Sequence, residues 1–351
     1  MLKKSLFCFI NTTIKQALKQ INVSGEKCLI VIDTEKKLLG TLSDGDLRRA
    51  ILKGIDFKKE IKNIYNKKPI SLLSKTFDNR DVRKIFLETK IDIIPVVNDN
   101  NEVVDILSWD KLFKSNKGEN KSLVEIPVVI MAGGRGERLE PFTRILPKPL
   151  VPIHEKPIIE HIIERFTNIG VKNFYLTVNY KSKIIKAYFD ELNADYNIHF
   201  VDEKTPMGTA GSLSLLEGKF NNPFFVTNCD IIIKADYANI LDFHEKSGND
   251  ISLVASAKEY IIPYGTCEVN NEGYLSRINE KPKYDFLINT GLYIINPNIL
   301  KHVPKNKFYH ITHLIEDVKN QGKKVGIFPI DDESWIDIGQ WVEYKKVVDA
   351  L

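Results

Sequence analysis

The first 115 residues contain an apolar pattern that occurs twice. Two apolar runs at 28–32 and 38–43 flank a polar turn, and the runs at 93–97 and 103–108 repeat them without gaps at a constant offset (93 − 28 = 65). Each copy predicts helix, strand, turn, strand and helix. Because one copy is too small to bury its own apolar faces, we expect the two to pack together. Apolar residues at helical spacing precede each pair of runs: Ile14, Ala17, Leu18 and Ile21, then Val82, Ile85 and Phe86.

From about residue 125 onward, short apolar runs alternate with helical patterns. This alternation predicts an α/β domain with a mostly parallel sheet, whose binding loops lie at the carboxyl ends of the strands. Residues 114–122 lack apolar side chains and predict a linker. We therefore divide the chain into 1–115, a linker at 116–124, and 125–351. We predict strands at 128–131, 173–178, 224–227, 251–255, 292–295 and 325–329, and helices at 158–166 and 183–190.

Composition is typical of a packed protein of two domains. The chain has 351 residues, 43% of them hydrophobic. Its 50 basic and 46 acidic residues leave a net charge of +4, too balanced to indicate nucleic acid or membrane as the main partner. No apolar run approaches the roughly 18 residues of a membrane span, and no secretory signal is recognised. The cysteines lack metal-binding spacing and are interpreted as free thiols of a reducing cytoplasm: Cys8, Cys28, Cys229 and Cys267.

Special residues concentrate in residues 127–149, which read PVVIMAGGRGERLEPFTRILPKP. A buried strand at 128–131 leads into Gly133, Gly134 and Gly136, where the absence of side chains lets backbone N–H groups approach a phosphate chain. The glycine spacing differs from a dinucleotide fingerprint, and no Gly-Lys-Ser/Thr closes a Walker loop. A nucleoside-triphosphate loop of another type remains. Three basic residues can neutralise its ligand: Arg138, Arg144 and Lys148.

This stretch resembles the signature of sugar-1-phosphate nucleotidyltransferases, Gly-Gly-x-Gly-x-Arg-Leu-x-Pro-x-Thr followed by Pro-Lys-Pro. Glu137 departs from it, since the family usually has a small or hydroxyl residue there. The resemblance implies a Rossmann-like nucleotidyltransferase domain in which Arg138 holds the leaving β- and γ-phosphates and Lys148 the α-phosphate. It also assigns nucleotide contacts to the loop: Met131, Ala132, Gly133, Gly134 and Gly136.

Residues 202–211, DEKTPMGTAG, resemble the family's Glu-x-x-Pro-Leu-Gly-Thr-Ala-Gly loop, which reads the nucleobase. Small residues there are expected to let a flat base lie against the backbone. Guanine offers two adjacent donors that one carboxylate accepts together, whereas uracil and thymine suit an amide. Glu203 therefore indicates GTP, with an Asp-Glu pair on a solvated turn as the alternative. The resemblance assigns base contacts to Glu203, Gly208, Thr209 and Ala210.

Two carboxylates are candidate metal ligands. Asp230 follows an apolar strand, and Asp337 stands between apolar neighbours, where a carboxylate needs a cation or hydrogen-bond donors. An Asp after a strand is also a common turn former. Beside the two loops above, Asp230 resembles the family's metal ligand, and we predict that Asp230 and Asp337 share one Mg²⁺.

Two later motifs resemble the family's sugar-phosphate side. Glu280 would accept from sugar hydroxyls, Lys281 would attract the incoming phosphate, and Gly291 would let the sugar approach closely. Each motif alone is ordinary turn material. The predicted sugar-binding residues are Gly265, Glu280, Asn289, Thr290 and Gly291.

The repeat of the first 115 residues resembles a tandem CBS-domain pair of α+β type, most clearly at residues 40–47, GTLSDGDL. In that family a Ser/Thr and an Asp three positions on hold the ribose of an adenine nucleotide, and Ser43 and Asp46 match. In the second copy Ser108 is kept but Lys111 replaces the Asp. Many such pairs serve only as scaffolds, so nucleotide sensing and dimerisation are both open interpretations.

Together the motifs predict transfer of a nucleotide from GTP to a sugar 1-phosphate, with pyrophosphate leaving. The arrangement resembles bacterial enzymes that activate sugar phosphates for surface glycans. Those that make GDP-glucosamine for legionaminic-acid-type nonulosonic sugars are similar, so glucosamine 1-phosphate is the first expectation. Mannose- and heptose-1-phosphate stay open, as does a uridylyl- or thymidylyltransferase. A catalytically silent, nucleotide-sensing regulator is the alternative from another class, and a homodimer or larger homo-oligomer is expected.

Overall fold

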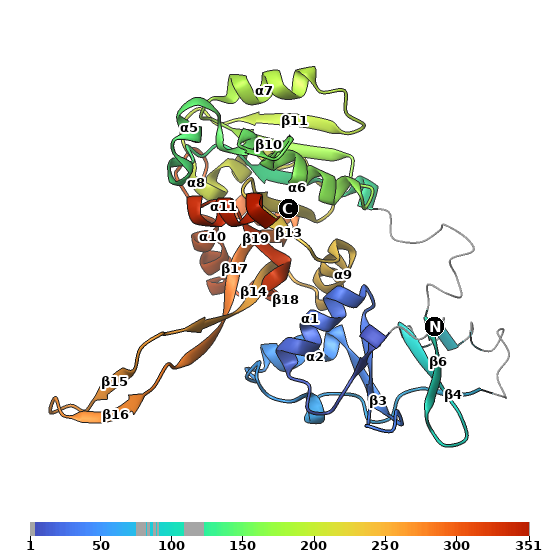
Figure 1. Ribbon diagram of the computed structural model, residues 1–351. Coiled ribbons are helices and arrows are strands. Elements are labelled where there is room, and N and C mark those ends of the chain that lie inside the picture. Colours follow the sequence, from blue (N-terminus) through green and yellow to red (C-terminus); the bar gives the residue numbers. More distant parts are fainter. Residues whose placement is uncertain are drawn as a thin grey trace. The chain divides into compact units, whose positions relative to one another are not determined.

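The computed structural model describes residues 4–74, 82, 85–86, 89, 91–108 and 123–350 (Figure 1). The chain forms two compact units, one of residues 1–118 and 257–287 and one of residues 119–256 and 288–351. We expected the second domain to run without interruption from residue 125, whereas segment 257–287 groups with the first unit. The predicted linker lies outside the described residues except for its last two, so the domain boundaries stay predictions.

The first unit contains the predicted repeat. Two three-stranded sheets form, β1-β2-β3 and β4-β5-β6, each with one parallel and one antiparallel pair. The long strands of the two copies begin 65 residues apart, as predicted (93 − 28 = 65). The helices and strands are β1 (Phe7–Cys8), α1 (Ile14–Ser24), β2 (Cys28–Ile32), β3 (Leu38–Ser43), α2 (Asp44–Leu52), β4 (Leu72–Leu73), β5 (Ile93–Val97), β6 (Val103–Ser108), β15 (Thr266–Val269) and β16 (Leu275–Asn279).

The two copies share their turn chemistry as well as their order. Asp33 Oδ1 accepts hydrogen bonds from two backbone N–H groups of its own turn, and Asn98 Oδ1, 65 residues later, does the same. Leu38 N and Val103 N each donate to a backbone carbonyl in the turn of the other copy, at 2.9 and 3.1 Å. Apolar residues from both copies form one buried cluster. The copies therefore pack together as expected.

The second unit is built on a seven-stranded sheet of order β11-β10-β7-β12-β17-β14-β18. The four strands from β11 to β12 are parallel, and β17 is antiparallel to β12, so the α/β class is confirmed with a mixed sheet. β14 and β17 also have residues in the first unit. The remaining elements are β7 (Val128–Met131), α5 (Phe142–Ile145), β8 (Pro152–Ile153), β9 (Lys156–Pro157), α6 (Ile158–Thr167), β10 (Asn173–Val178), α7 (Ser182–Glu191), β11 (Asn197–Asp202), α8 (Gly208–Gly211), β12 (Phe224–Asn228), β13 (Ile231–Ile233), α9 (Tyr237–Ser247), β14 (Ile251–Ile261), β17 (Lys283–Ile295), α10 (Ile311–Asn320), β18 (Val325–Asp331), β19 (Trp335–Asp337) and α11 (Trp341–Ala350).

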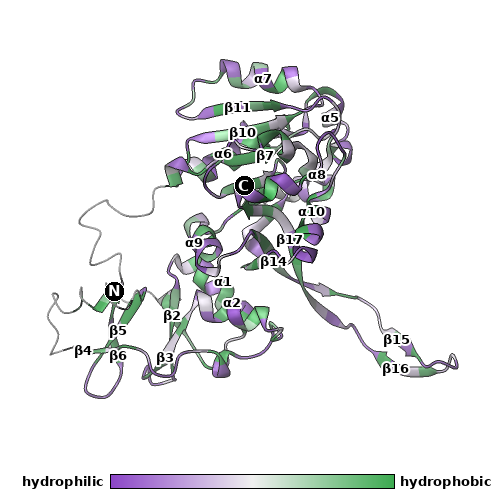
Figure 2. Cartoon of the chain, turned by 180° about the vertical axis from the view of Figure 1, so that it is seen from behind, coloured by the Kyte–Doolittle hydropathy of each residue, from purple (hydrophilic) through white to green (hydrophobic). Residues whose placement is uncertain are grey.

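Apolar residues cover both faces of this sheet. Alternate residues of β7 belong to two different buried clusters. Val128 and Ile130 belong to the cluster that contains residues of α6, α7 and α9. Val129 and Met131 belong to the cluster that contains residues of α10. Figure 2 shows β7 as hydrophobic throughout, whereas α7 has polar residues on its turns. Burial on both faces explains why β7 reads as a continuous apolar run. The parallel strands β7, β10, β11 and β12 end at the same edge, where ligands bind in sheets of this kind. No helix among the described residues is long and apolar enough to span a bilayer.

Candidate active site

The glycine-rich loop leaves β7 at the edge where the parallel strands end. Ala132 N donates to Thr177 O at 2.9 Å, which fixes the start of the loop beside β10. Gly136 has a φ of 72°, and a Cβ there would lie 2.8 Å from Lys148 Cβ and 3.0 Å from Thr143 Cγ2. Thr143 Oγ1 donates to Gly136 O at 3.0 Å. The loop therefore folds back onto Lys148, and glycine is required at the contact.

Two carboxylates and two cations meet around Gly339. The antiparallel pairing of β13 with β19 brings the residue before β13 beside the end of β19. A Cβ on Gly339 would lie well under 3.0 Å from Asp230 Oδ2 and 2.9 Å from Asp337 Oδ1. It would also lie 3.3 Å from Arg138 Nη2. Lys148 Nζ forms an ion pair with Asp230 Oδ2, and both side chains are nearly buried. The structure thus brings together four residues that the sequence placed in catalysis or metal binding.

This cluster fits a divalent cation. Burial raises the pKa of Asp337, and the charge of Asp230 raises it further. The N–H of Gly339, which donates to Asp337 Oδ1 at 2.8 Å, and the two cations oppose the shift. In the described part of the chain no three His, Cys, Asp or Glu side chains are placed to hold a metal. Two carboxylates are nevertheless sufficient, because proteins ordinarily bind Mg²⁺ through one or two carboxylates while phosphate and water supply its other ligands.

Glu203 follows β11 and lies against the same loop. Glu203 as a whole is 8% exposed, and a Cβ on Gly133 would lie 2.7 Å from Glu203 Oε1. Oε2 accepts from Met207 N at 3.1 Å, and Asn179 Nδ2 donates to the Glu203 carbonyl at 2.7 Å. Burial raises the pKa of Glu203, and the Met207 N–H opposes this shift. The alternative of a solvated turn is therefore wrong for Glu203, and Gly133 is the residue that lets the carboxylate approach the loop.

A hollow of about 340 Å³ joins the glycine-rich loop, Glu203, Lys148 and Asp230, and Asp337 does not line it. Ala132 and Ala210, both predicted to bind nucleotide, are buried and do not line it. Ten predicted site residues line it: Met131, Gly133, Gly134, Gly136, Arg138, Lys148, Glu203, Gly208, Thr209 and Asp230. It is also lined by residues that we did not predict: Thr177, Pro206, Met207, Asn228, Cys229, Phe308 and His310. The sequence held no signal for Phe308 and His310, whose segment lies about 100 residues from the nearest predicted base contact and carries no motif.

The small residues at 208–211 do not all face open space. A Cβ on Gly208 would lie 2.7 Å from Tyr309 O, and one on Gly211 would lie 2.5 Å from Lys307 O. Ala210 N and Gly211 N both donate to Tyr309 O, at 2.9 and 3.1 Å. We expected these positions to be small so that a flat base could lie against the backbone. In the structure the backbone of 307–309 occupies that space at Gly208 and Gly211, which corrects this part of the expectation.

Three of the predicted sugar-binding residues lie in β17 and do not line the hollow. Thr290 Oγ1 donates to a backbone carbonyl of β14 at 2.8 Å, and the Asn289 amide exchanges hydrogen bonds with the Tyr293 hydroxyl at 2.9 and 3.0 Å. Gly291 has a φ of 89°, and a Cβ there would overlap Asn228 Nδ2. Gly291 therefore lets β17 approach the end of β12. The contacts of these residues with a sugar stay predictions.

The other sugar-side residues belong to the first unit, where β15 and β16 form a narrow two-stranded ribbon (Figure 1). Gly265 precedes β15, and Glu280 and Lys281 follow β16. A Cβ on Gly265 would lie 2.9 Å from Glu280 Oε2, so the structure brings these two residues together. Lys281 has a φ of 46°. None of the three lines the hollow of the second unit.

Ser43 and Asp46, the predicted adenine-nucleotide ligands, cap α2. Ser43 Oγ accepts from Asp46 N at 3.1 Å, and Asp46 Oδ2 accepts from Ser43 N at 2.9 Å. Arg49 also pairs with Asp46. The two side chains thus have a structural role as a capping box, while nucleotide binding by them stays a prediction. Lys111, which replaces the corresponding Asp of the second copy, lies outside the described residues.

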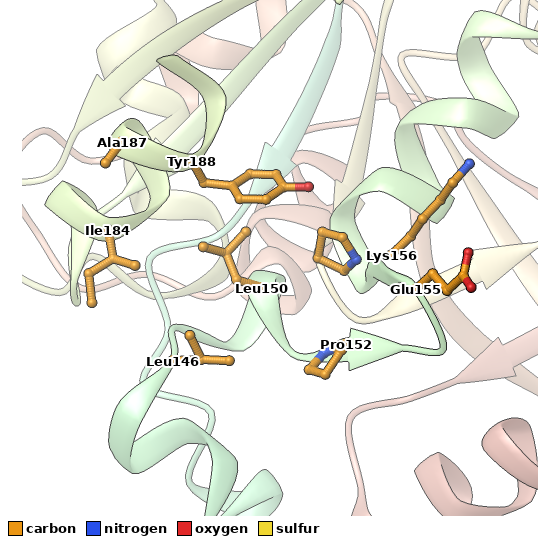
Figure 3. Close-up of a pocket in the computed structure, with 9 residues that line it drawn as sticks. Leu146, Leu150, Pro152, Glu155, Lys156, Ile184, Ala187 and Tyr188 are labelled. Atoms are coloured by element: carbon orange, nitrogen blue, oxygen red, sulfur yellow. The ribbon is translucent and has the colours of Figure 1, made fainter. Parts of the chain in front are cut away.

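A second hollow of about 420 Å³ lies beside α7 (Figure 3). Its lining is mostly apolar, and its charged members Glu155 and Lys156 lie together at one side (Figure 3). It contains none of the predicted site residues: the lining is Leu146, Leu150, Pro152, Glu155, Lys156, Pro157, Ile184, Ala187 and Tyr188. With a single cation and no glycine loop, it does not have the chemistry of a triphosphate site.

Both parts of the chain match known protein families. Residues 127–351 match the family model for nucleotidyl transferases, and residues 1–53 and 61–117 match the CBS domain. The chain belongs to the nucleotidyl transferase family. This confirms the predicted nucleotidyltransferase fold and the CBS pair that precedes it.

Relatives of this nucleotidyl transferase include fungal enzymes. It is 39% identical over 185 residues to mannose-1-phosphate guanyltransferase of Hypocrea jecorina, covering 50% of each chain. It is 35% identical over 222 residues to that of Saccharomyces cerevisiae, covering 60% of this chain and 61% of the other. It thus spans between half and about three-fifths of these relatives. The crystal structure of HddC from Yersinia pseudotuberculosis matches with a TM-score of 0.50 and 26% identity, covering 64% of this chain and 98% of HddC.

Proposed function

We propose that this nucleotidyl transferase is a sugar-1-phosphate guanylyltransferase, which makes a GDP-sugar and pyrophosphate from GTP and a sugar 1-phosphate. The observation that carries the proposal is the cluster of two carboxylates and two cations around Gly339, beside the glycine-rich loop. Glu203 supports guanine, because one carboxylate accepts the two adjacent donors of that base. The similarity to mannose-1-phosphate guanyltransferases supports the same nucleotide.

The proposed reaction depends on charge neutralisation and alignment. The attacking sugar-phosphate oxygen is already an anion, so no general base is required. Lys148 neutralises charge at the α-phosphate and Arg138 at the leaving pyrophosphate, while Lys281 attracts the sugar phosphate. Asp230 and Asp337 would hold Mg²⁺, which when bound supplies further neutralisation of the triphosphate.

For the acceptor we propose a hexose 1-phosphate. Glucosamine 1-phosphate is the first candidate, because Glu280 can pair with a 2-ammonium group, and mannose 1-phosphate is supported by the fungal relatives. We also propose a cytoplasmic enzyme of bacterial surface-glycan synthesis that forms homo-oligomers through its CBS pair. Adenine-nucleotide binding at Ser43 and Asp46 would couple this synthesis to the energy state.

The experiment that tests the proposal is pyrophosphate release with Mg²⁺, using GTP, UTP, dTTP, CTP and ATP against a panel of sugar 1-phosphates. Turnover with GTP and one hexose 1-phosphate is expected. Turnover with UTP or dTTP alone would keep a nucleotidyltransferase and reject guanine. Absence of turnover with every pair, with nucleotide binding retained, would favour the silent regulator.

The catalytic assignment has its own test in Asp230→Asn. This isosteric change removes the charge that pairs with Lys148, and we expect turnover to fall by about 10²–10³-fold while the fold is kept. Near-normal turnover by a folded D230N protein would reject Asp230 as a catalytic-site ligand.

A further inference from the structure

Two buried hydroxyl groups near Glu203 have no partner of ordinary hydrogen-bond geometry. Thr177 lies in β10 and lines the hollow, and Ser212 directly follows α8; both side chains are 0% exposed. A buried hydroxyl without a partner is destabilising by roughly 1–3 kcal/mol, so these two require an explanation. Glu203 N donates to Val178 O at 2.9 Å, which holds Glu203 beside the end of β10, and Thr177 and Glu203 line the same hollow. Hydrogen bonding from both hydroxyls lowers the pKa of Glu203.

The carboxylate of Glu203 has acceptor capacity to spare. Oε2 accepts one backbone N–H, from Met207, and Oε1 lies toward the Cα of Gly133. A carboxylate has about four lone-pair sites, and a hydroxyl hydrogen rotates freely to reach one. Glu203 is therefore the acceptor available to both Thr177 and Ser212, and the two hydroxyls would complete two hydrogen bonds to the same anion. Such bonds favour the charged form of an acid.

We propose that Thr177 and Ser212 are positioning residues that set nucleobase specificity, because their hydroxyl groups hold Glu203 as an ionised acceptor for guanine. This inference rests on the proposed function. An ionised carboxylate only accepts hydrogen bonds, which suits the two adjacent donors of guanine. A protonated carboxyl carries one donor and one acceptor, which suits uracil or thymine. The two hydroxyls thus decide between two classes of nucleotide through the protonation of one side chain.

Burial raises the pKa of Glu203, and the hydrogen bonds from Met207, Thr177 and Ser212 lower it. Asp202, the preceding residue, is exposed and pairs with Lys186 at 2.7 Å. The other ionisable groups that flank Glu203 in the chain or line the same hollow are Arg138, Lys148, Lys204, Asp230 and His310.

The test compares wild type with T177V/S212A, measuring kcat/KM for GTP and for UTP with one hexose 1-phosphate between pH 5.5 and 8.5. Removing the two donors raises the pKa of Glu203, so the loss of GTP activity on acidification moves to higher pH by about one unit. At the acid end the ratio of GTP to UTP activity falls by about tenfold. T177S keeps the hydroxyl and is expected to behave like wild type.

The matched controls are T227V, in β12 on the other side of β7 from β10, and S214A, in the same segment as Ser212. The hydroxyls that they remove donate to backbone carbonyls, Asn228 O at 3.1 Å and Gly211 O at 2.7 Å, and we expect wild-type profiles. If the double variant does not fold, T177V alone is expected to give about half the pH shift. An unchanged pH profile and nucleotide ratio in folded T177V would overturn the inference. Absence of GTP turnover in wild type would instead reject the proposed function.

Discussion

Replacing Gly339 by alanine should separate the catalytic geometry from the fold. The new Cβ would lie well under 3.0 Å from Asp230 Oδ2 and 2.9 Å from Asp337 Oδ1. Ordinary contact begins near 3.4 Å, so the carboxylates must move by a distance on the order of 1 Å. A misplacement of that size costs about 10²-fold in rate, or about 2.7 kcal/mol of transition-state stabilisation. We therefore expect kcat to fall by about two orders of magnitude.

The assay is steady-state pyrophosphate release, paired with urea unfolding of the same preparations. G326A is the matched control, because its Cβ would overlap Asn249 Nδ2. Gly326 lies in the edge strand β18, three strands away from β12, and no site residue is among the contacts of its Cβ. Both variants should lose about 1–3 kcal/mol of unfolding free energy to overpacking. Only G339A should lose kcat. A folded G339A protein with kcat within threefold of wild type, or an equal loss of kcat in G326A, would show that the position of the two carboxylates beside Gly339 does not limit turnover.

Three other changes test separate parts of the account. Phe308 is 63% exposed and lines the hollow, where it is placed to stack on the base. F308A should therefore raise KM for GTP about tenfold with kcat little changed. An unaltered KM would exclude stacking. Burial lowers the pKa of His244, whose ring contacts Ser252 Oγ at 2.9 Å and Asn296 Oδ1 at 3.1 Å. As pH falls below about 6.5, His244 is therefore protonated in the unfolded chain before it is protonated in the folded protein. In this pH range the unfolding free energy decreases by up to about 1.4 kcal/mol for each unit by which the pH falls. Urea unfolding of wild type and H244Q at pH 7.5 and 5.5 measures the effect, because wild type should lose more unfolding free energy than H244Q between these pH values. Equal losses in the two proteins would contradict the prediction. S43A removes the cap of α2 and should destabilise the first unit by about 1 kcal/mol, and an unshifted urea midpoint would show that the cap contributes nothing.

The strands that position the site were predictable because they are buried on both faces. β7 reads as a continuous apolar run, β10 and β12 are mostly apolar, and the predicted limits of all three agree with the structure to within one residue. The CBS-like repeat was predictable for a different reason. Its copies share a constant offset, so the turn at Asp33 recurs at Asn98 with the same hydrogen bonds.

The role of Gly339 was not predictable from the sequence. It depends on the pairing of β13 with β19, two strands of three residues that lie about 100 residues apart, and neither has a periodic signal of its own. Thr177 was missed because a single hydroxyl within an apolar strand resembles any other buried threonine. Gly208 was interpreted as making room for a base because the sequence does not indicate that Tyr309 packs against it. Contacts between distant segments decided each of these cases.

Identification of the products is the decisive test of the proposed reaction. The 351-residue chain would be incubated with GTP, Mg²⁺ and a hexose 1-phosphate labelled with ¹⁸O in its phosphate, and the nucleotide products analysed by mass spectrometry. Attack of the sugar-phosphate oxygen on the α-phosphorus predicts a GDP-sugar that carries the label, with unlabelled pyrophosphate in equal amount. Label in the pyrophosphate, or hydrolysis of GTP without a nucleotide sugar from any hexose 1-phosphate, would contradict the account.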